Sequence, residues 1–190
     1  MADSKLTGLT TVAPAAGALV YGVMDPAGTP ISRAFTVQTV GRVVQRVNTQ
    51  TGAMATGTTI IPADDTIPQN TEGTEFMTLA ITPTSATNVL VIQVTALLST
   101  GTATRTITAA LFQDTTANAL AVGNGAGSNL GYVHTITFTH TMTAGTTSAT
   151  TFKVRGGVDV SGTITFNGAT GARLFGGVMA SSITITEYIP

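Results

Sequence analysis

The sequence predicts an all-β protein built around a β-sandwich. Threonine, a β-branched residue that suits pleated and half-exposed strands, accounts for about forty of the 190 residues. Short apolar runs alternate with clusters of turn-forming residues at fairly even spacing, which is typical of sandwiches and barrels. No window sustains a period near 3.6 residues without glycine or threonine clusters, so no helix is predicted.

The first part of the chain, residues 1–42, is predicted to contain a β-hairpin. A short β run at 19–24 leads into a Pro- and Gly-containing turn at 25–30, and residues 33–37 form the returning strand. A lone two-stranded hairpin is only marginally stable in water. We therefore expect this segment to dock onto another protein.

The second part is predicted to be a connecting strand or linker at 43–52, followed by the sandwich at 53–190. The wet faces of its strands are largely threonine and carry few of the charges that usually block pairing at sheet edges. We therefore expect the chain to form an oligomer. The strands are predicted at residues 75–81, 88–94, 104–112, 132–140, 149–155, 160–166 and 181–189.

Alternation of apolar and polar residues predicts strands with one buried face. In 151–155, Phe152 and Val154 face one way and the polar residues face the other. In 160–166, Val160 is expected on the buried face together with the other apolar residues. The isoleucines of 181–189 oppose its serine and threonines in the same manner.

Charge and cysteine content exclude several classes of function. Charged residues make up 9% of the chain and the net charge is −1, which argues against tracking a nucleic-acid backbone. The chain has no cysteine, so disulfides and thiolate metal sites are impossible. The longest apolar run, 89–98, is far shorter than the roughly 20 residues that span a bilayer. We expect neither nucleic-acid binding nor membrane insertion.

The two histidines are predicted to pack in the core. His134 and His140 share the parity of Ile136 and Phe138, so both lean toward the buried face. They lie six residues apart on one strand, which is about 20 Å, and cannot share a metal ion within one chain. The alternative is an ion bound by one histidine from each copy around a threefold axis.

Four acidic residues gather in one stretch: Asp64, Asp65, Glu72 and Glu75. Paired carboxylates serve glycoside hydrolysis and clustered oxygens bind Ca²⁺, but this segment has neither EF-hand spacing nor an aromatic platform nearby. It is predicted to be a solvated loop whose carboxylates cap turns or pair with arginine.

No motif of an enzyme is present. The Gly-rich segment 123–127 lacks the Lys-Ser/Thr of a phosphate loop and is predicted to be a flexible loop. There is no Gly-x-Ser-x-Gly elbow and no cysteine nucleophile. We expect no enzyme activity, no cofactor and no metal site.

Residues 5–42 resemble an N-terminal segment that recurs in tail-fibre and other virion proteins of bacteriophages. The similarity lies in Lys5–Leu9, Tyr21, Asp25–Pro30 and Phe35–Val37. In that family the segment commonly precedes a variable distal domain and serves as an attachment piece. The resemblance implies that residues 1–42 anchor the chain to a virion.

Most of the remaining chain is similar to a domain of phage and prophage structural proteins. The family implies a jelly-roll-like β-sandwich, often trimeric, without a catalytic role. The similar stretches are 64–73, 79–87, 110–114, 141–155, 171–173 and 180–187.

These observations together predict a homotrimeric virion protein, assembled in the cytoplasm of a host bacterium and released by lysis. Its partners would be major capsid proteins, for a decoration, cement or head-fibre protein. The alternative is a short tail-fibre protein that joins tail proteins and binds a host surface glycan. The residues predicted to dock onto the virion are Leu19, Tyr21, Asp25, Pro26, Arg33, Phe35 and Arg42.

Overall fold

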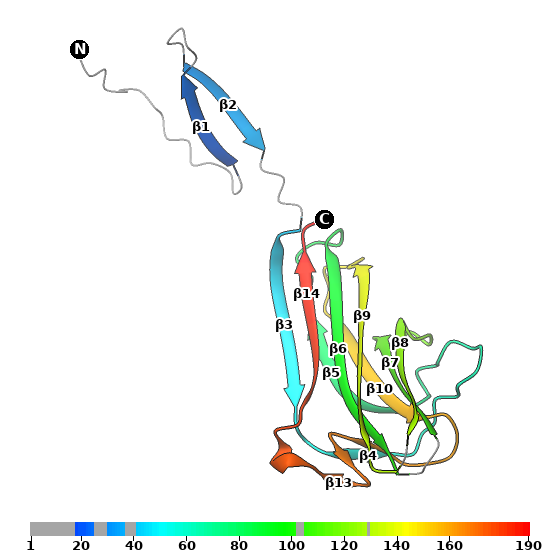
Figure 1. The fold of residues 1–190 in the computed structure, drawn as a ribbon. Coiled ribbons are helices and arrows are strands. Elements are labelled where there is room, and N and C mark those ends of the chain that lie inside the picture. The colour runs from blue at the N-terminus through cyan, green and yellow to red at the C-terminus, as the bar shows by residue number, and fades with distance from the viewer. Residues whose placement is uncertain (1–17, 25–29, 37–40, 102–104, 129) are drawn as a thin grey trace. The chain divides into compact units, whose positions relative to one another are not determined.

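The chain divides into two units, Met1–Val40 and Gly41–Pro190. The computed structural model in Figure 1 describes residues 18–24, 30–36, 41–101, 105–128 and 130–190. Side chains are described from residue 41 onward, except at 126–128.

The first unit contains the hairpin expected within 1–42. Strand β1 (Ala18–Met24) pairs antiparallel with β2 (Pro30–Thr36) along its whole length. The turn expected between them lies outside the described residues.

The second unit is all-β, as predicted, and its described residues contain one short turn, η1 (Phe175–Gly177), whose backbone has positive φ throughout. Eight strands form the sandwich: β3 (Val43–Thr51), β5 (Thr74–Ile81), β6 (Val89–Thr100), β7 (Arg105–Gln113), β8 (Ala121–Ser128), β9 (Val133–Thr143), β10 (Thr150–Val158) and β14 (Ser181–Tyr188). Four short strands lie in the connections: β4 (Ala55–Gly57), β11 (Ile164–Phe166), β12 (Gly168–Ala169) and β13 (Ala172–Arg173).

Two sheets pack face to face (Figure 1). The first has the order β3-β14-β6-β9, extended by β11 and β4, and the second has the order β5-β10-β7-β8. Among the eight sandwich strands, the first pairs with the last, the second with the seventh, the third with the sixth and the fourth with the fifth. This nested pairing is the topology of a jelly roll, so the predicted fold class is confirmed.

The core lies between the inner faces of the two sheets. Alternate residues of β6 point inward and are fully buried, including Leu90 and Ile92. Phe152 and Val154 of β10 meet them from the other sheet, as the alternation in 151–155 predicted. Burial of each such side chain contributes about 1.5–3 kcal/mol. Near the end of β6, Phe76 and Phe166 stack with their ring centroids 4.9 Å apart.

Two segments are more regular parts of the sandwich than the sequence indicates. Residues 43–52, expected as a connecting strand or linker, contain β3, which pairs with β14 inside the sandwich. The Gly-rich segment 123–127, predicted to be a flexible loop, belongs to β8 and pairs with β7. A Cβ atom at Gly123 would lie 2.7 Å from the Phe138 ring and 2.8 Å from Ile136, so glycine lets β9 approach β8 closely. The prediction for this segment was wrong.

The strand predicted at 160–166 is shorter than expected. Only Ile164–Phe166 forms a strand, and Ile164 and Phe166 are buried as predicted. Val160, expected on the buried face, is 45% exposed because it lies in the loop before β11. This part of the prediction was wrong.

Candidate functional site

The structure distributes the predicted docking residues over both units. Asp25 and Pro26 lie outside the described residues, and Arg42 is exposed where the chain enters the sandwich. The other four lie on the hairpin in two directly opposed pairs, Leu19 with Phe35 and Tyr21 with Arg33. The hairpin register thus brings two aromatic residues, one aliphatic residue and one cation to neighbouring backbone positions.

The chain enters the sandwich at a fixed point. The Gly41 amide donates to the Ile189 carbonyl at 3.0 Å, and the Ile189 amide donates to the Arg42 carbonyl at 3.0 Å. This short antiparallel pairing ties the first residues of the second unit to the end of β14. The start of the second unit is therefore fixed to the sheet by backbone hydrogen bonds.

A buried carboxylate stabilises this end of the sandwich. Glu187 of β14 is 0% exposed and points inward opposite Leu90. Its Oε1 accepts hydrogen bonds from the Asn88 amide at 2.6 Å and from both the Thr84 backbone N–H and hydroxyl at 2.8 Å. Its Oε2 accepts one from Gln45 of β3 at 2.5 Å. We call these four residues the Glu187 cluster.

The cluster keeps the carboxylate ionised. Burial by itself raises the pKa of Glu187, but the hydrogen bonds from Asn88, Gln45 and Thr84 outweigh it and lower the pKa from 4.5 to about 2. The charge is held by neutral donors rather than by a cation. The parity of β14 carried a signal for this position, because Ile183, Ile185 and Glu187 alternate on one side of the strand.

The outer face of the first sheet is rich in hydroxyl and amide groups. The registers align Asn48, Thr184, Gln93 and Thr139 in one row across the four strands, and Gln50, Ser182, Thr95 and Thr137 in the next. Along β3, β14, β6 and β9, all of which are described, Arg46 is the one charged residue on this side. The result is a broad surface with almost no charge.

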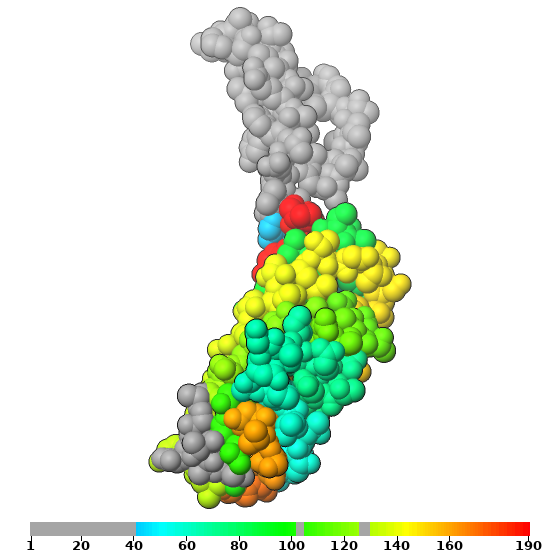
Figure 2. Space-filling model, turned by 90° about the vertical axis from the view of Figure 1, so that its right-hand side faces the viewer, coloured from blue at the N-terminus to red at the C-terminus, as the bar shows by residue number. Residues whose placement is uncertain are grey.

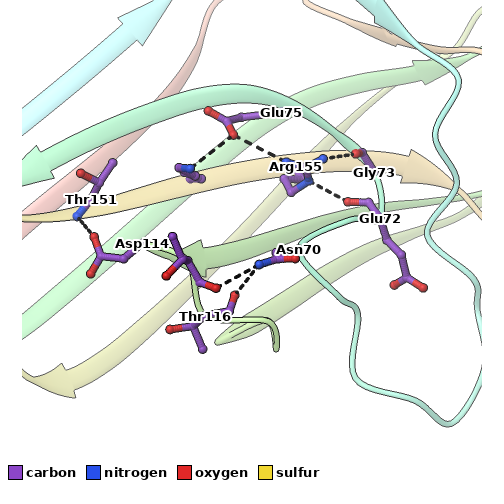
Figure 3. Close-up of polar contacts among 10 residues, drawn as sticks. Asn70, Glu72, Gly73, Glu75, Asp114, Thr116, Thr151 and Arg155 are labelled. Atoms are coloured by element: carbon purple, nitrogen blue, oxygen red, sulfur yellow. Dashed lines mark hydrogen bonds and ion pairs between the residues drawn. The ribbon is translucent and has the colours of Figure 1, made fainter.

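The acidic stretch forms a fixed loop on the second sheet (Figure 3). Arg155 of β10 donates to the carbonyls of Glu72 and Gly73 at 2.8 Å, and its guanidinium lies 3.6 Å from Glu75. The Asn70 amide donates to the carbonyls of Thr115 and Thr116 in the β7–β8 turn. The expected pairing with arginine is thus present for Glu75.

The same turn is attached to β10 by Asp114. Its Oδ1 accepts from the Thr151 backbone N–H at 2.7 Å (Figure 3). Its Oδ2 accepts from the Thr150 hydroxyl at 2.8 Å. Asp114 has a φ of 50°, a conformation that aspartate tolerates better than most residues. The turn and the loop at 62–73 therefore form one connected surface region.

Neither histidine belongs to a cluster of metal ligands in the described part of the chain. His134 lies opposite Leu98 and His140 opposite Ile92, both half-buried on the inner side of β9, as their parity predicted. Burial lowers the pKa of His140. No described helix is long and apolar enough to cross a membrane.

The fold and these surfaces define a jelly-roll protein, and comparisons with known proteins add no family. No protein-family model matches the chain, and no curated protein matches it. The solved structure of Eiger TNF from S. frugiperda aligns with 8% identity over 76% of this chain and 93% of that chain, with a TM-score of 0.41.

Two structures of infectious bursal disease virus also align, each with 10% identity over 91% of this chain and 43% of the viral chain. They are the VP2 subviral particle, with a TM-score of 0.35, and the Gx strain, with a TM-score of 0.34. At TM-scores below 0.5, none of these likenesses assigns the chain a function.

Proposed function

We propose that the chain is a non-enzymatic structural protein of a bacteriophage virion, a homotrimeric decoration, cement or head-fibre protein. The observation that carries the proposal is the nearly uncharged outer face of the first sheet. Long strands without charges invite pairing and packing with other chains. In a capsid protein, contacts between copies would cover such a face.

The N-terminal segment supports the same role. The hairpin residues predicted to dock lie in opposed pairs on β1 and β2, and the chain leaves them to enter the sandwich at a backbone-paired junction. In this role the first unit would anchor the chain and the second unit would be displayed. The resemblance of residues 5–42 to attachment segments of virion proteins points in the same direction.

Sedimentation equilibrium tests the trimer. We expect a mass three times that of the 19.2 kDa chain. Thr139→Arg, on the exposed outer side of β9, should dissociate it, because a charge buried without a partner is costly. Thr78→Arg is the matched control, since Thr78 is an exposed threonine on β5 of the other sheet. A monomer for the unmodified chain would contradict the proposal.

Immunogold electron microscopy of the parent virus, with antibody against residues 53–190, tests the location. Gold over the head is the expected result. Gold confined to the tail would favour the second candidate, a short tail-fibre protein that binds a host glycan. No gold on intact particles would contradict both.

A further inference from the structure

A cavity of about 230 Å³ lies on the outer side of the second sheet, between the sheet and the loop that leads into β5. In Figure 2 this loop, coloured cyan to teal, forms part of the molecular surface. Thr108 of β7 and Val122 and Asn124 of β8 supply the sheet side of the cavity, and residues 61–64, 66 and 68 supply the other. Thr108 and Asn124 are directly opposite each other in the β7–β8 register.

The loop that lines the cavity is held in place by packing and by backbone hydrogen bonds. Ile61 is fully buried against Ala110 and Phe112, in a small second core outside the main one. Its amide donates to the Val158 carbonyl at 2.9 Å, and the Gly73 amide donates to the Ile60 carbonyl at 2.9 Å, which closes the loop at its base. Because the loop is already held in place, a ligand would bind without first having to order it.

Polar groups without protein partners point to a ligand. Thr108 is only 5% exposed, yet its hydroxyl has no hydrogen bond within the described part of the chain. The Asn124 side chain is exposed, so its amide is open to a ligand. Buried hydroxyls are normally hydrogen-bonded. The Asp64 carboxylate also lines the cavity, and only its Oδ1 is engaged, by the backbone N–H of Thr66 at 2.9 Å and by the Thr66 hydroxyl at 2.5 Å.

The charge and the hydrogen-bonding capacity of these groups indicate the class of ligand. None of the lining residues is basic, and the Thr66 hydrogen bonds, side chain first and backbone second, lower the pKa of Asp64, so an anionic ligand would be repelled. A lysine-like cation would use the carboxylate but leave the donors of Asn124 unused. Vicinal hydroxyls use both kinds of group, because each hydroxyl donates and accepts. Pro62, Pro68 and Val122 add an apolar wall for a C–H face.

We propose that this cavity binds one uncharged pyranose residue of a glycan, through hydrogen bonds to Asp64, Thr108 and Asn124. The volume is below the range of about 300–1,000 Å³ that is usual for drug-sized ligands, which limits the site to a single ring. This binding activity is independent of whether the chain sits on the head or the tail of a particle.

The test is a titration of the full ¹⁵N-labelled chain, followed by amide chemical shifts, with the methyl glycosides of glucose, galactose, mannose and N-acetylglucosamine. At least one should bind with millimolar affinity and shift amides of 61–68, 108 and 122–124. Asp64→Asn should weaken binding about tenfold, since a hydrogen bond to a charged group is lost. The asparagine keeps the Oδ1 acceptor for Thr66, so the turn is retained.

Asp65→Asn is the matched control, because it removes the same charge one residue away and Asp65 does not line the cavity. It should change the affinity less than about twofold. Thr108→Val removes the buried hydroxyl at nearly constant volume and should also weaken binding, which keeps the test valid if Asp64→Asn disturbs the loop.

Two results would overturn the inference. One is the absence of saturable shifts with all four glycosides. The other is binding of Nα-acetyl-lysine, sensitive to Asp64→Asn, in place of the glycosides, which would make the partner a basic side chain. Neither result bears on the trimer or on the gold labelling, so failure of this site is distinguishable from failure of the structural role.

Discussion

Two buried polar clusters lie at opposite ends of β14. Both attach loops to the sandwich through hydrogen bonds, but one contains a charge and the other does not. At the end near the chain entry, the Glu187 cluster holds an ionised carboxylate with neutral donors. At the other end, Asn167, Ser181 and their backbone partners form a cluster without charge, which we call the Asn167 cluster. Asn167 and Ser181 are both 0% exposed.

The Asn167 cluster joins the β11–β12 connection to three strands. The Asn167 amide donates to the carbonyls of Thr51 and Ala53 at 2.7 and 3.1 Å, and its backbone N–H donates to the Leu97 carbonyl at 2.9 Å. The Ser181 hydroxyl donates to the Asn167 Oδ1 at 2.7 Å and accepts from the Leu97 amide at 2.9 Å. Every group here is neutral, so this end of the sandwich should be insensitive to pH.

The comparison shows that a jelly roll can fix its loops with or without charge. A buried charge binds its donors more strongly but makes the fold depend on protonation. The neutral cluster gives weaker individual bonds and instead uses an asparagine with a φ of 54°, a conformation that other side chains adopt less readily.

The largest effect is expected for Glu187→Ala. It removes the charged acceptor of four hydrogen bonds, one each from Asn88 and Gln45 and two from Thr84, so the free energy of unfolding should fall by about 4 kcal/mol. Urea denaturation measures this. Glu75→Ala is the control, because that carboxylate is 36% exposed and its ion pairs contribute at most about 1 kcal/mol. Equal losses of unfolding free energy for the two variants would contradict a special role of the buried carboxylate.

Acid should weaken the charged end alone. The folded-state pKa of Glu187, about 2, lies below its ordinary value of 4.5, so the stabilisation is complete above about pH 4.5 and is lost as the pH falls toward 2. The loss amounts to about 3 kcal/mol. Unfolding free energies across this window, for the unmodified chain and for Glu187→Gln, should differ in slope. Parallel curves would contradict the assignment.

Asn167→Ala should lower the free energy of unfolding by about 3 kcal/mol. It removes the side-chain hydrogen bonds, and alanine at positive φ has no polar side chain to compensate for the backbone strain. Asn167→Gly should cost about 1 kcal/mol less, since glycine accepts this φ. Denaturant midpoints measure both variants. If the two were equally unstable, the backbone conformation would contribute nothing to this end.

Ser181→Ala should have the smallest effect, a loss of about 2 kcal/mol, because the Leu97 amide and one lone pair of Asn167 lose their partner. The measurement is again the free energy of unfolding, taken at neutral pH and near pH 3. The loss should be the same at both, in contrast to Glu187→Gln. A loss that changed with pH would show that the two clusters are coupled along β14.

Much of the fold follows from local pattern. The period-two alternation in 151–155 and in 181–189 predicts which residues enter the core, and Phe152, Ile183 and Ile185 do so. The parity of His134 and His140 predicts the side of β9 on which they lie. Such predictions succeed because successive residues of any strand point to opposite faces, whatever the neighbouring strands are.

The functional surfaces depend on pairing that no local pattern contains. Asp64 attracts attention in the sequence as part of an acidic stretch, but Thr108 and Asn124 do not. They form a cavity wall only because β7 pairs with β8 in one register and the loop from β4 folds over them. The residues predicted to dock through the hairpin, by contrast, follow from a resemblance, and their role stays a prediction.

The sequence by itself determined the all-β class, the hairpin and the inward parity of the strand residues, because β-branched content and alternation act within a single strand. The tertiary structure alone decided that the Gly-rich segment becomes a strand and that residues 43–51 belong to the sandwich, since β7 and β14 supply their backbone partners. It also decided that Glu187 stays charged, because its donors come from β3 and from the β5–β6 connection. Such donors are distant in the sequence and meet only when the sandwich closes.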